Sequence, residues 1–336
     1  MSDVYRVLVV NPGSTGTKLA IFSTAGREAE ETVSAPPEKG PLLAQLPSRV
    51  QAAREFLARH GAVPLHAVVG RGGLIRPVPS GTLAVNEAML EDARRGYQGE
   101  HVSNLGCLIA HGLASERGIP AFVVDPVAVD EMIPLARYSG LPGLPRQALS
   151  HALNLHAAAR KACERLGKKL SESRLVVAHL GGGFSIVPME AGRIVDTNHA
   201  NSGGPFSPTR AGTLPTQPLV RLCFSGSATA ADLKRMTTKE GGLLAHLGTH
   251  DALEVESRIA QGDLKAREVY EAMAYQTAKE IGAMATVLCC RLDAVVLTGG
   301  LAHSNLFCTW VSDRVAPLAP LFRFPGEFEM EALARG

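Results

Sequence analysis

Apolar and polar residues form blocks along the chain whose lengths match those of strands and helices. The first block, Val7 to Phe22, reads VLVVNPGSTGTKLAIF, so two apolar runs flank a turn of small residues. This pattern predicts two strands joined by a tight turn. Further patterns predict strands over 66–69, 121–124, 175–180, 184–187 and 294–297, and helices over 42–60, 86–95, 103–117, 150–167, 264–290 and after Glu327. Strands and helices therefore alternate, which is typical of an α/β fold.

Three glycine-rich turns, 11–18, 181–183 and 298–300, follow predicted strands. Glycine permits close approach of a ligand to the backbone, and ligands bind at strand ends in α/β sheets. The strand–glycine turn–strand pattern of 175–187 repeats that of the first block, which suggests two similar halves. A Rossmann fingerprint is absent from the sequence, so the turns favour a nucleotide-binding fold of another kind.

The first turn carries groups that suit a phosphate and its magnesium ion. Hydroxyls, backbone amides and one positive charge are supplied by Gly13, Ser14, Thr15, Gly16, Thr17 and Lys18. The spacing rejects a P-loop, because Lys18 follows a threonine and an apolar run continues after it. An ordinary turn of small residues is the alternative, and the hairpin alone does not decide between the two.

Composition restricts the class of protein. A length of 336 residues predicts two domains, and the Pro- and Gly-containing segment 134–147 reads as the linker between them. The net charge of +2 gives no indication of a nucleic-acid or membrane surface, and no apolar run reaches the ~18 residues of a membrane span. An apolar run begins at Val7, so we expect no signal peptide. Six cysteines without zinc spacing fit the reducing cytoplasm.

Several motifs occur in the order found in one known family. They are NPGSTGTK, VGRGG, HVSNLG, DPVAVDEMIP, SHALN, HLGGGFS, GPFSPTRAGTLP, LTGG and PGEFEMEALA. In these motifs the chain resembles the butyrate kinases, carboxylate kinases of the acetokinase family within the superfamily of acetate and sugar kinases, heat-shock ATPases and actin. The resemblance implies two duplicated actin-like (ribonuclease H-like) α/β domains with a cleft between them. Residues 1–145, joined by a C-terminal helix over 326–336, would bind the acyl substrate, and 146–325 the nucleotide.

The reaction that the resemblance implies is reversible phosphoryl transfer between ATP and butyrate, giving butyryl phosphate and ADP, with Mg²⁺. A carboxylate is already ionised at neutral pH, so the enzyme needs no strong base. It must hold two anions in line and neutralise charge in the transition state. A kinase for branched-chain or other short-chain acids and a non-catalytic ATP-binding regulatory module remain as alternatives. We expect a homo-oligomer of at least two subunits.

The resemblance assigns catalytic roles to Arg71, Asp125, His151 and Arg210. Arg71 would bind the substrate carboxylate, His151 would stabilise the transition state, and Arg210 would span the transferring phosphoryl oxygens. Ser150 replaces the phenylalanine that usually precedes this histidine. A histidine near a helix start is also commonly a packing residue. Oxygens for Mg²⁺ are implied at Asn11, Ser14, Asp125 and Glu329, with Glu331 open as an alternative to Glu329.

Further residues are implied for the two substrates. The nucleotide positions are Asn11, Ser14, Lys18, His179, Gly181, Gly182, Gly183, Asp251, Thr298, Gly299, Gly300 and Leu301. The acid positions are Arg71, Gly73 and His101. Gly73 stands where acetate kinase has a valine that crowds its pocket. Its small size would leave room for extra methylenes, each worth roughly 0.8 kcal/mol when buried.

Overall fold

The computed structural model describes residues 4–34, 41–60 and 64–336. The chain divides into two units, each with its own sheet and core. Unit 1 is Met1–Val129 with Phe328–Gly336, and unit 2 is Asp130–Glu327. The sequence analysis places the boundary after residue 145 and joins 326–336 to the first domain. In the structure the chain enters unit 2 at Asp130 and returns to unit 1 at Phe328.

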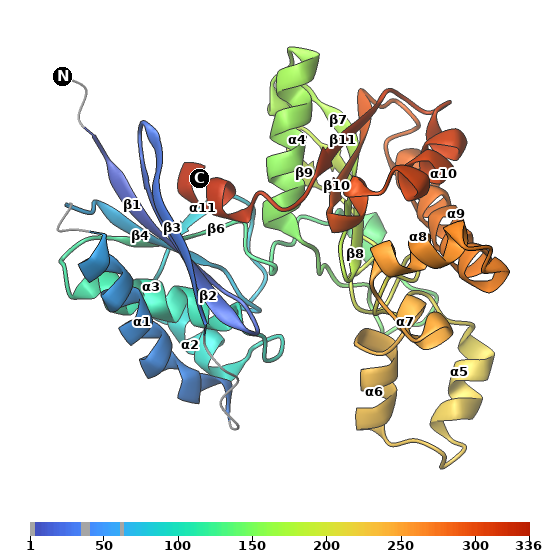
Figure 1. The fold of residues 1–336 in the computed structure, drawn as a ribbon, viewed down its shortest axis with the longest axis horizontal. Coiled ribbons are helices and arrows are strands. Elements are labelled where there is room, and N and C mark those ends of the chain that lie inside the picture. Colours follow the sequence, from blue (N-terminus) through green and yellow to red (C-terminus); the bar gives the residue numbers. More distant parts are fainter. Residues whose placement is uncertain (1–3, 35–40, 61–63) are drawn as a thin grey trace. The chain divides into compact units, whose positions relative to one another are not determined.

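Unit 1 contains a mixed sheet whose strand order is β3-β2-β1-β4-β6-β5 (Figure 1). The strands are β1 (Arg6–Pro12), β2 (Gly16–Ser23), β3 (Gly26–Ser34), β4 (Ala67–Arg71), β5 (Thr82–Ala84) and β6 (Ala121–Val124). The predicted hairpin is the antiparallel pair of β1 and β2, while β1, β4 and β6 run parallel. The carboxyl ends of these three parallel strands therefore meet at one edge of the sheet.

Helices cover both faces of this sheet (Figure 1). They are α1 (Leu46–Arg59), α2 (Glu87–Arg95), α3 (Asn104–Ser115) and α11 (Glu329–Arg335). Leu105, Ile109 and Leu113 of α3 recur every four residues and have no exposed surface, so this apolar stripe forms the centre of the core. Helix α3 packs on β1, β4 and β6, with α1 and α2 beside it. Helix α11 contacts the same three strands from the other face.

Unit 2 repeats the arrangement with strand order β11-β10-β7-β8-β9. Its strands are β7 (Arg174–Leu180), β8 (Phe184–Glu190), β9 (Arg193–Ile194), β10 (Ala294–Gly299) and β11 (Leu321–Pro325). In each unit an antiparallel hairpin stands beside two strands that run parallel to its first strand. The prediction of a duplicated α/β architecture is thereby confirmed.

The helices of unit 2 lie on both faces of its sheet and at one end of it (Figure 1). They are α4 (Ala152–Leu166), α5 (Thr216–Cys223), α6 (Ala230–Thr238), α7 (Gly242–Leu247), α8 (Ala252–Ala260), α9 (Leu264–Val287) and α10 (Asn305–Val315). Helix α4 packs on β7 and β10, and α9 packs on β7 and β8 with α10 against it. No helix in the described part of the chain is long and apolar enough to cross a membrane.

The segment 134–147, predicted as a linker, is part of unit 2. Met132, Ala136 and Ala148 form a small buried cluster. The guanidinium of Arg146 donates to the backbone oxygen of Thr197 (2.8 Å) and forms an ion pair with Asp196 (2.9 Å). Proline and glycine therefore mark a turn-rich stretch here, and its hydrogen bonds hold it against the segment that follows β9. The predicted linker was wrong for this reason.

Candidate active site

Three of the predicted site residues of unit 1 come from the carboxyl ends of neighbouring strands. Asn11 lies near the end of β1, Arg71 ends β4, and Asp125 directly follows β6. Because β4 pairs with β1 and with β6, these three positions lie side by side at one edge of the sheet. Glu329 joins them from the first turn of α11, which contacts all three strands.

Asn11, Arg71 and Glu329 form a hydrogen-bonded group, which we term the acid-side cluster. Glu329 accepts from the Asn11 amide (2.7 Å) and from both terminal nitrogens of Arg71 (3.0 and 2.7 Å). Arg71 also donates to Asn11 Oδ1 (3.3 Å). The side chains of Arg71 and Glu329 are 20% and 11% exposed, so the ion pair is partly shielded from water. The structure thus brings together a fork that can bind a carboxylate and oxygens that can bind a cation.

Asp125 has a strained backbone at the end of β6. Its φ is +39°, which is uncommon for a residue other than glycine. Gly81 holds it from both sides, because its N–H donates to Asp125 Oδ1 (2.7 Å) and its oxygen accepts from the Asp125 N–H (3.0 Å). Strain of this kind collects at functional sites. Asp125 as a whole is 1% exposed.

Arg49 of α1, which the sequence patterns did not single out, fixes the first turn. It is 1% exposed, and its guanidinium donates to the backbone oxygens of Gly13 (3.0 Å) and Gly16 (3.1 Å) and to the Thr17 hydroxyl (2.8 Å). This places Thr17 on the helix-covered side of the hairpin. Lys18, its neighbour, is exposed on the other side and pairs with a glutamate of β3.

Ser14, at the tip of the same turn, is exposed. Arg49 therefore fixes the position of the turn that carries Ser14.

The structure corrects the role expected of Gly73. A Cβ placed on Gly73 would overlap Asn104 Oδ1 and lie 2.5 Å from Asn104 Cα, at the start of α3. The Asn104 side chain in turn accepts from the Leu74 N–H (2.8 Å). Glycine is thus required for close packing of a helix, and it does not open space for the acid. His101 lies three residues before α3, where its ring contacts Ser103 Oγ (2.7 Å).

In unit 2 the glycine turn 181–183 joins β7 to β8 and is held by the loop that carries Arg210. Gly182 O accepts from Ser207 Oγ (2.7 Å) and Thr209 Oγ1 (3.0 Å). The guanidinium of Arg210 lies directly against Gly183, where a Cβ would overlap it, and donates to the backbone oxygen of Ala200 (2.6 Å).

Burial lowers the pKa of Arg210 below its ordinary value, but an arginine remains charged at neutral pH. A fixed cation therefore lies against the buried Gly183 of the turn, next to the exposed Gly182.

The imidazole rings of His151 and His179 stack on each other beside this turn. Their ring centroids are 4.2 Å apart and the rings are nearly parallel. His151 precedes the first residue of α4, and its Nδ1 contacts the buried hydroxyl of Ser185 (2.8 Å). His179 ends β7, and a Cβ on Gly181 would lie 2.9 Å from its Nε2. We call His151, His179, Arg210 and the turn 181–183 the phosphate-side cluster.

The turn at the end of β10 is largely buried. Thr298 has no exposed surface and Leu301 is 6% exposed. The nucleotide contact expected of Thr298 to Leu301 remains a prediction. Gly299 has φ of +89° and packs on the backbone of β7, whereas Gly300 is exposed and its backbone is accessible.

Asp251 caps the N-terminus of α8, because its carboxylate accepts from the Leu253 N–H (2.9 Å). The structure therefore gives this carboxylate a structural task, and its contact with adenosine remains a prediction.

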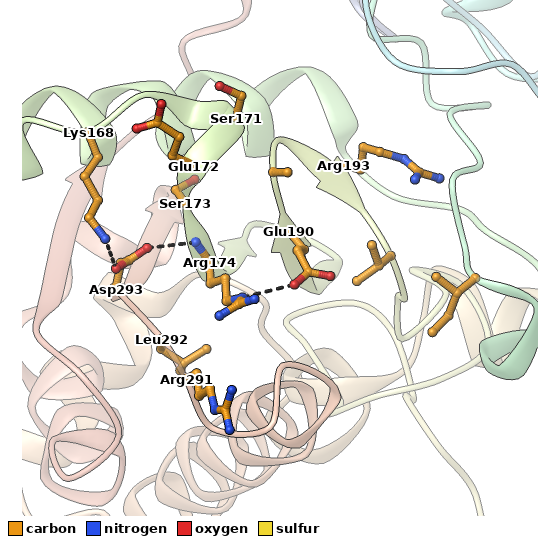
Figure 2. A pocket seen from close by; sticks show the side chains of 13 residues that line it. Lys168, Ser171, Glu172, Ser173, Arg174, Glu190, Arg193, Arg291, Leu292 and Asp293 are labelled. Atoms are coloured by element: carbon orange, nitrogen blue, oxygen red, sulfur yellow. Dashed lines mark hydrogen bonds and ion pairs between the residues drawn. The ribbon is translucent and has the colours of Figure 1, made fainter.

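A separate cavity of about 710 Å³ lies at the opposite edge of the unit 2 sheet (Figure 2). It opens where β7 begins at Arg174, about 20 Å along the strand from the glycine turn. Lys168 pairs with Asp293, and Arg174 pairs with Glu190 (3.0 Å), so much of the charge that lines the cavity is already neutralised (Figure 2). No residue predicted for the site lines this cavity.

One relative among the known proteins decides the family. The chain is 47% identical, over 339 aligned residues, to a protein named probable butyrate kinase 2 from Caldanaerobacter subterraneus subsp. tengcongensis, and the match covers 99% of this chain and 96% of that protein. The chain belongs to the acetokinase family. The family model itself, described as "Acetokinase family", matches residues 146–312. The predicted resemblance is therefore confirmed, together with the predicted class of phosphotransferase that uses ATP/ADP and a carboxyl acceptor.

Solved structures of the family share the fold. An acetate kinase from Porphyromonas gingivalis superposes with a TM-score of 0.77 at 19% identity, and one from Entamoeba histolytica with 0.80 at 15%. Each match covers 98% of both chains. At these identities the likeness shows the architecture alone, and it confirms the predicted actin-like class of duplicated domains.

Proposed function

We propose that this acetokinase-family member is a butyrate kinase, which transfers a phosphoryl group reversibly between ATP and butyrate. The observation that supports butyrate as the acid is the near-full-length 47% identity to a protein named probable butyrate kinase 2. The two clusters support the chemistry. One holds an arginine fork suited to a carboxylate, and the other holds a half-buried arginine and two histidines beside a glycine turn in which Gly182 is exposed.

In unit 1 the Arg71 guanidinium binds the carboxylate of the acid. Arg71 already binds Glu329 through two nitrogens, so an incoming carboxylate shares or displaces this partner. The oxygens of Asn11 and Glu329, with Asp125 on the neighbouring strand end, are hard donors of the kind that Mg²⁺ prefers. When bound there, Mg²⁺ would supply positive charge to the phosphates and occupy the Glu329 carboxylate. Arg71 would then be free to bind the acid.

In unit 2 the backbone of Gly181–Gly183 and the exposed Gly300 approach the nucleotide phosphates. Arg210 neutralises charge on the transferring phosphoryl group, because it is fixed in place before the substrate arrives and is half-buried. His151 and His179 supply hydrogen-bond donors to phosphoryl oxygens. No general base is required, because the acid is already ionised at neutral pH.

The alternatives differ in what they require of these residues. A non-catalytic ATP-binding module has no use for the Arg71–Glu329 fork or for the half-buried Arg210, and both are intact. A kinase for branched or other short acids would use the same two clusters, so the acid itself has to be measured. We also propose a cytoplasmic homodimer, which light scattering of the purified protein would test.

A coupled hydroxylamine assay tests the function. Purified protein with ATP, Mg²⁺ and hydroxylamine is expected to form an acyl hydroxamate from butyrate, with a higher kcat/KM than from acetate. Isobutyrate, propionate and valerate complete the series. An optimum at another acid would move the assignment within the family, and no hydroxamate from any acid would refute the kinase.

A further inference from the structure

Three buried side chains behind the glycine turn form one hydrogen-bond network in unit 2. Asn154 comes from α4, His179 from the end of β7 and Thr298 from β10. The Asn154 amide nitrogen lies 2.8 Å from His179 Nδ1 and 3.2 Å from Thr298 Oγ1. None of the three residues is more than 2% exposed. Their hydrogen bonds are therefore made within a dry interior, where mismatched donors and acceptors are costly.

Thr298 determines which way the Asn154 amide points. Its hydroxyl donates to the backbone oxygen of Gly326 (3.3 Å), so its oxygen lone pairs are left to accept. Asn154 can satisfy that oxygen only with its NH₂ group. The reversed amide would bring two acceptors together at Thr298. The NH₂ group therefore faces both Thr298 and His179.

The amide in turn determines where the His179 ring carries its hydrogen. Nδ1 accepts from Asn154, so in the neutral ring the hydrogen lies on Nε2. Nε2 is also the nitrogen that lies against Gly181. An N–H donor is thereby presented at the glycine turn, whereas the other tautomer would direct a lone pair there and repel an anion.

We propose that Asn154, oriented by Thr298, is a positioning residue that holds His179 in the Nε2–H form, so that the ring donates a hydrogen bond to a phosphate oxygen of the nucleotide. This inference rests on the proposed function of the phosphate-side cluster. Both positioning residues act through His179, since the Asn154 amide contacts its Nδ1 and Thr298 contacts that amide.

Nitrogen NMR of the full chain tests this directly. With ¹⁵N-labelled histidine, long-range ¹H–¹⁵N correlations show which ring nitrogen carries the hydrogen, and the His179→Gln spectrum identifies the His179 signals. In the wild type we expect hydrogen on Nε2. Asn154→Asp places an acceptor at Nδ1, so hydrogen should appear there, and Asn154→Leu should leave the tautomer unfixed.

Activity is expected to depend on which nitrogen of the His179 ring carries the hydrogen. Variants of Asn154 and Thr298→Val should lower kcat in proportion to the loss of Nε2–H, by on the order of 10- to 100-fold when it is largely lost, as for other partners that orient a functional histidine. The matched control is Thr277→Val on α9. It removes an equally buried hydroxyl that bonds only within its own helix (2.8 Å), and it should change neither the tautomer nor kcat.

Two results would overturn the inference. One is a wild-type His179 with its hydrogen on Nδ1, and the other is a loss of kcat that follows thermal stability while the tautomer stays unchanged. ATP affinity, measured by calorimetry, separates this inference from the proposed function. A wild type that binds ATP but phosphorylates no acid refutes the function, while the tautomer and the ATP affinity of the variants still decide the inference.

Discussion

The contact between Gly183 and Arg210 gives the sharpest prediction. A Cβ on Gly183 would lie 2.5 Å from Arg210 Nε and overlap the rest of the guanidinium. Nonbonded atoms prefer about 3.5 Å, so Gly183→Ala has to move the guanidinium by about 1 Å. Arg210 is held by its bond to Ala200 O, so it cannot yield without losing position. A misplacement of this size costs about 100-fold in kcat, or about 2.7 kcal/mol of barrier.

Gly282 on α9 supplies the control. A Cβ on Gly282 meets nothing within 4 Å, and the residue lies outside the glycine turn. Gly282→Ala should therefore keep kcat within a few-fold of wild type, as measured by hydroxamate formation at saturating ATP and acid. Both variants add one methyl group to unit 2, so the effect of the added methyl alone is matched.

A double-mutant cycle shows whether Arg210 carries the effect. If Gly183→Ala acts by displacing Arg210, the substitution should cost almost nothing further in an Arg210→Ala background. Equal losses in the two backgrounds would refute this reasoning, and so would a Gly183→Ala enzyme as active as Gly282→Ala.

Three further predictions concern unit 1. Gly73→Val should lower the melting temperature by forcing Asn104 away, and should not shift kcat/KM toward shorter acids; a stable variant that prefers acetate would contradict this. Arg49→Met should lower kcat/KM for ATP and lose about 2–4 kcal/mol of unfolding free energy in urea, because it leaves buried carbonyls without their donor; wild-type stability would contradict it. Hydrogen bonds from Arg76 hold the pKa of Asp92 below its ordinary 3.8 in the folded protein. The ionised Asp92 therefore stabilises the fold above pH 3.8, and this contribution is lost as the pH falls through the lower pKa of the folded state. Asp92→Asn should cost about 1–3 kcal/mol at pH 7 and progressively less below pH 3.8, measured by urea unfolding, and a pH-independent difference would contradict this.

The sequence predicted the elements that carry strong local patterns. The hairpins of both units, the buried strands and the long helix α9 follow from apolar runs and helical periodicity. The short helices α5 to α8 gave no comparable pattern, because α5 and α6 bury no residue and so need no long apolar stripe. The predicted linker failed because proline and glycine mark turns without saying what those turns pack against.

Site residues could be predicted only where they belong to a sequence motif. Arg210 was expected beside the glycine turn, and the hydrogen bonds of Ser207 and Thr209 to that turn explain how a distant loop delivers it. The sequence did not identify Arg49 and Asn154, because it does not show which polar residues of a helix are buried against the neighbouring strands. Gly73 was misread for a related reason, since a missing side chain signals a close neighbour as readily as an open pocket.

The most direct test of the account is phosphoryl transfer observed by ³¹P NMR in the reverse direction. Purified protein with butyryl phosphate, ADP and Mg²⁺ should show the acyl phosphate signal replaced by the signals of ATP. Arg71→Ala and Arg210→Ala should each slow this conversion by at least about 100-fold while the protein stays folded. A wild type that leaves butyryl phosphate intact, or arginine variants that transfer the group as fast as wild type, would contradict the account.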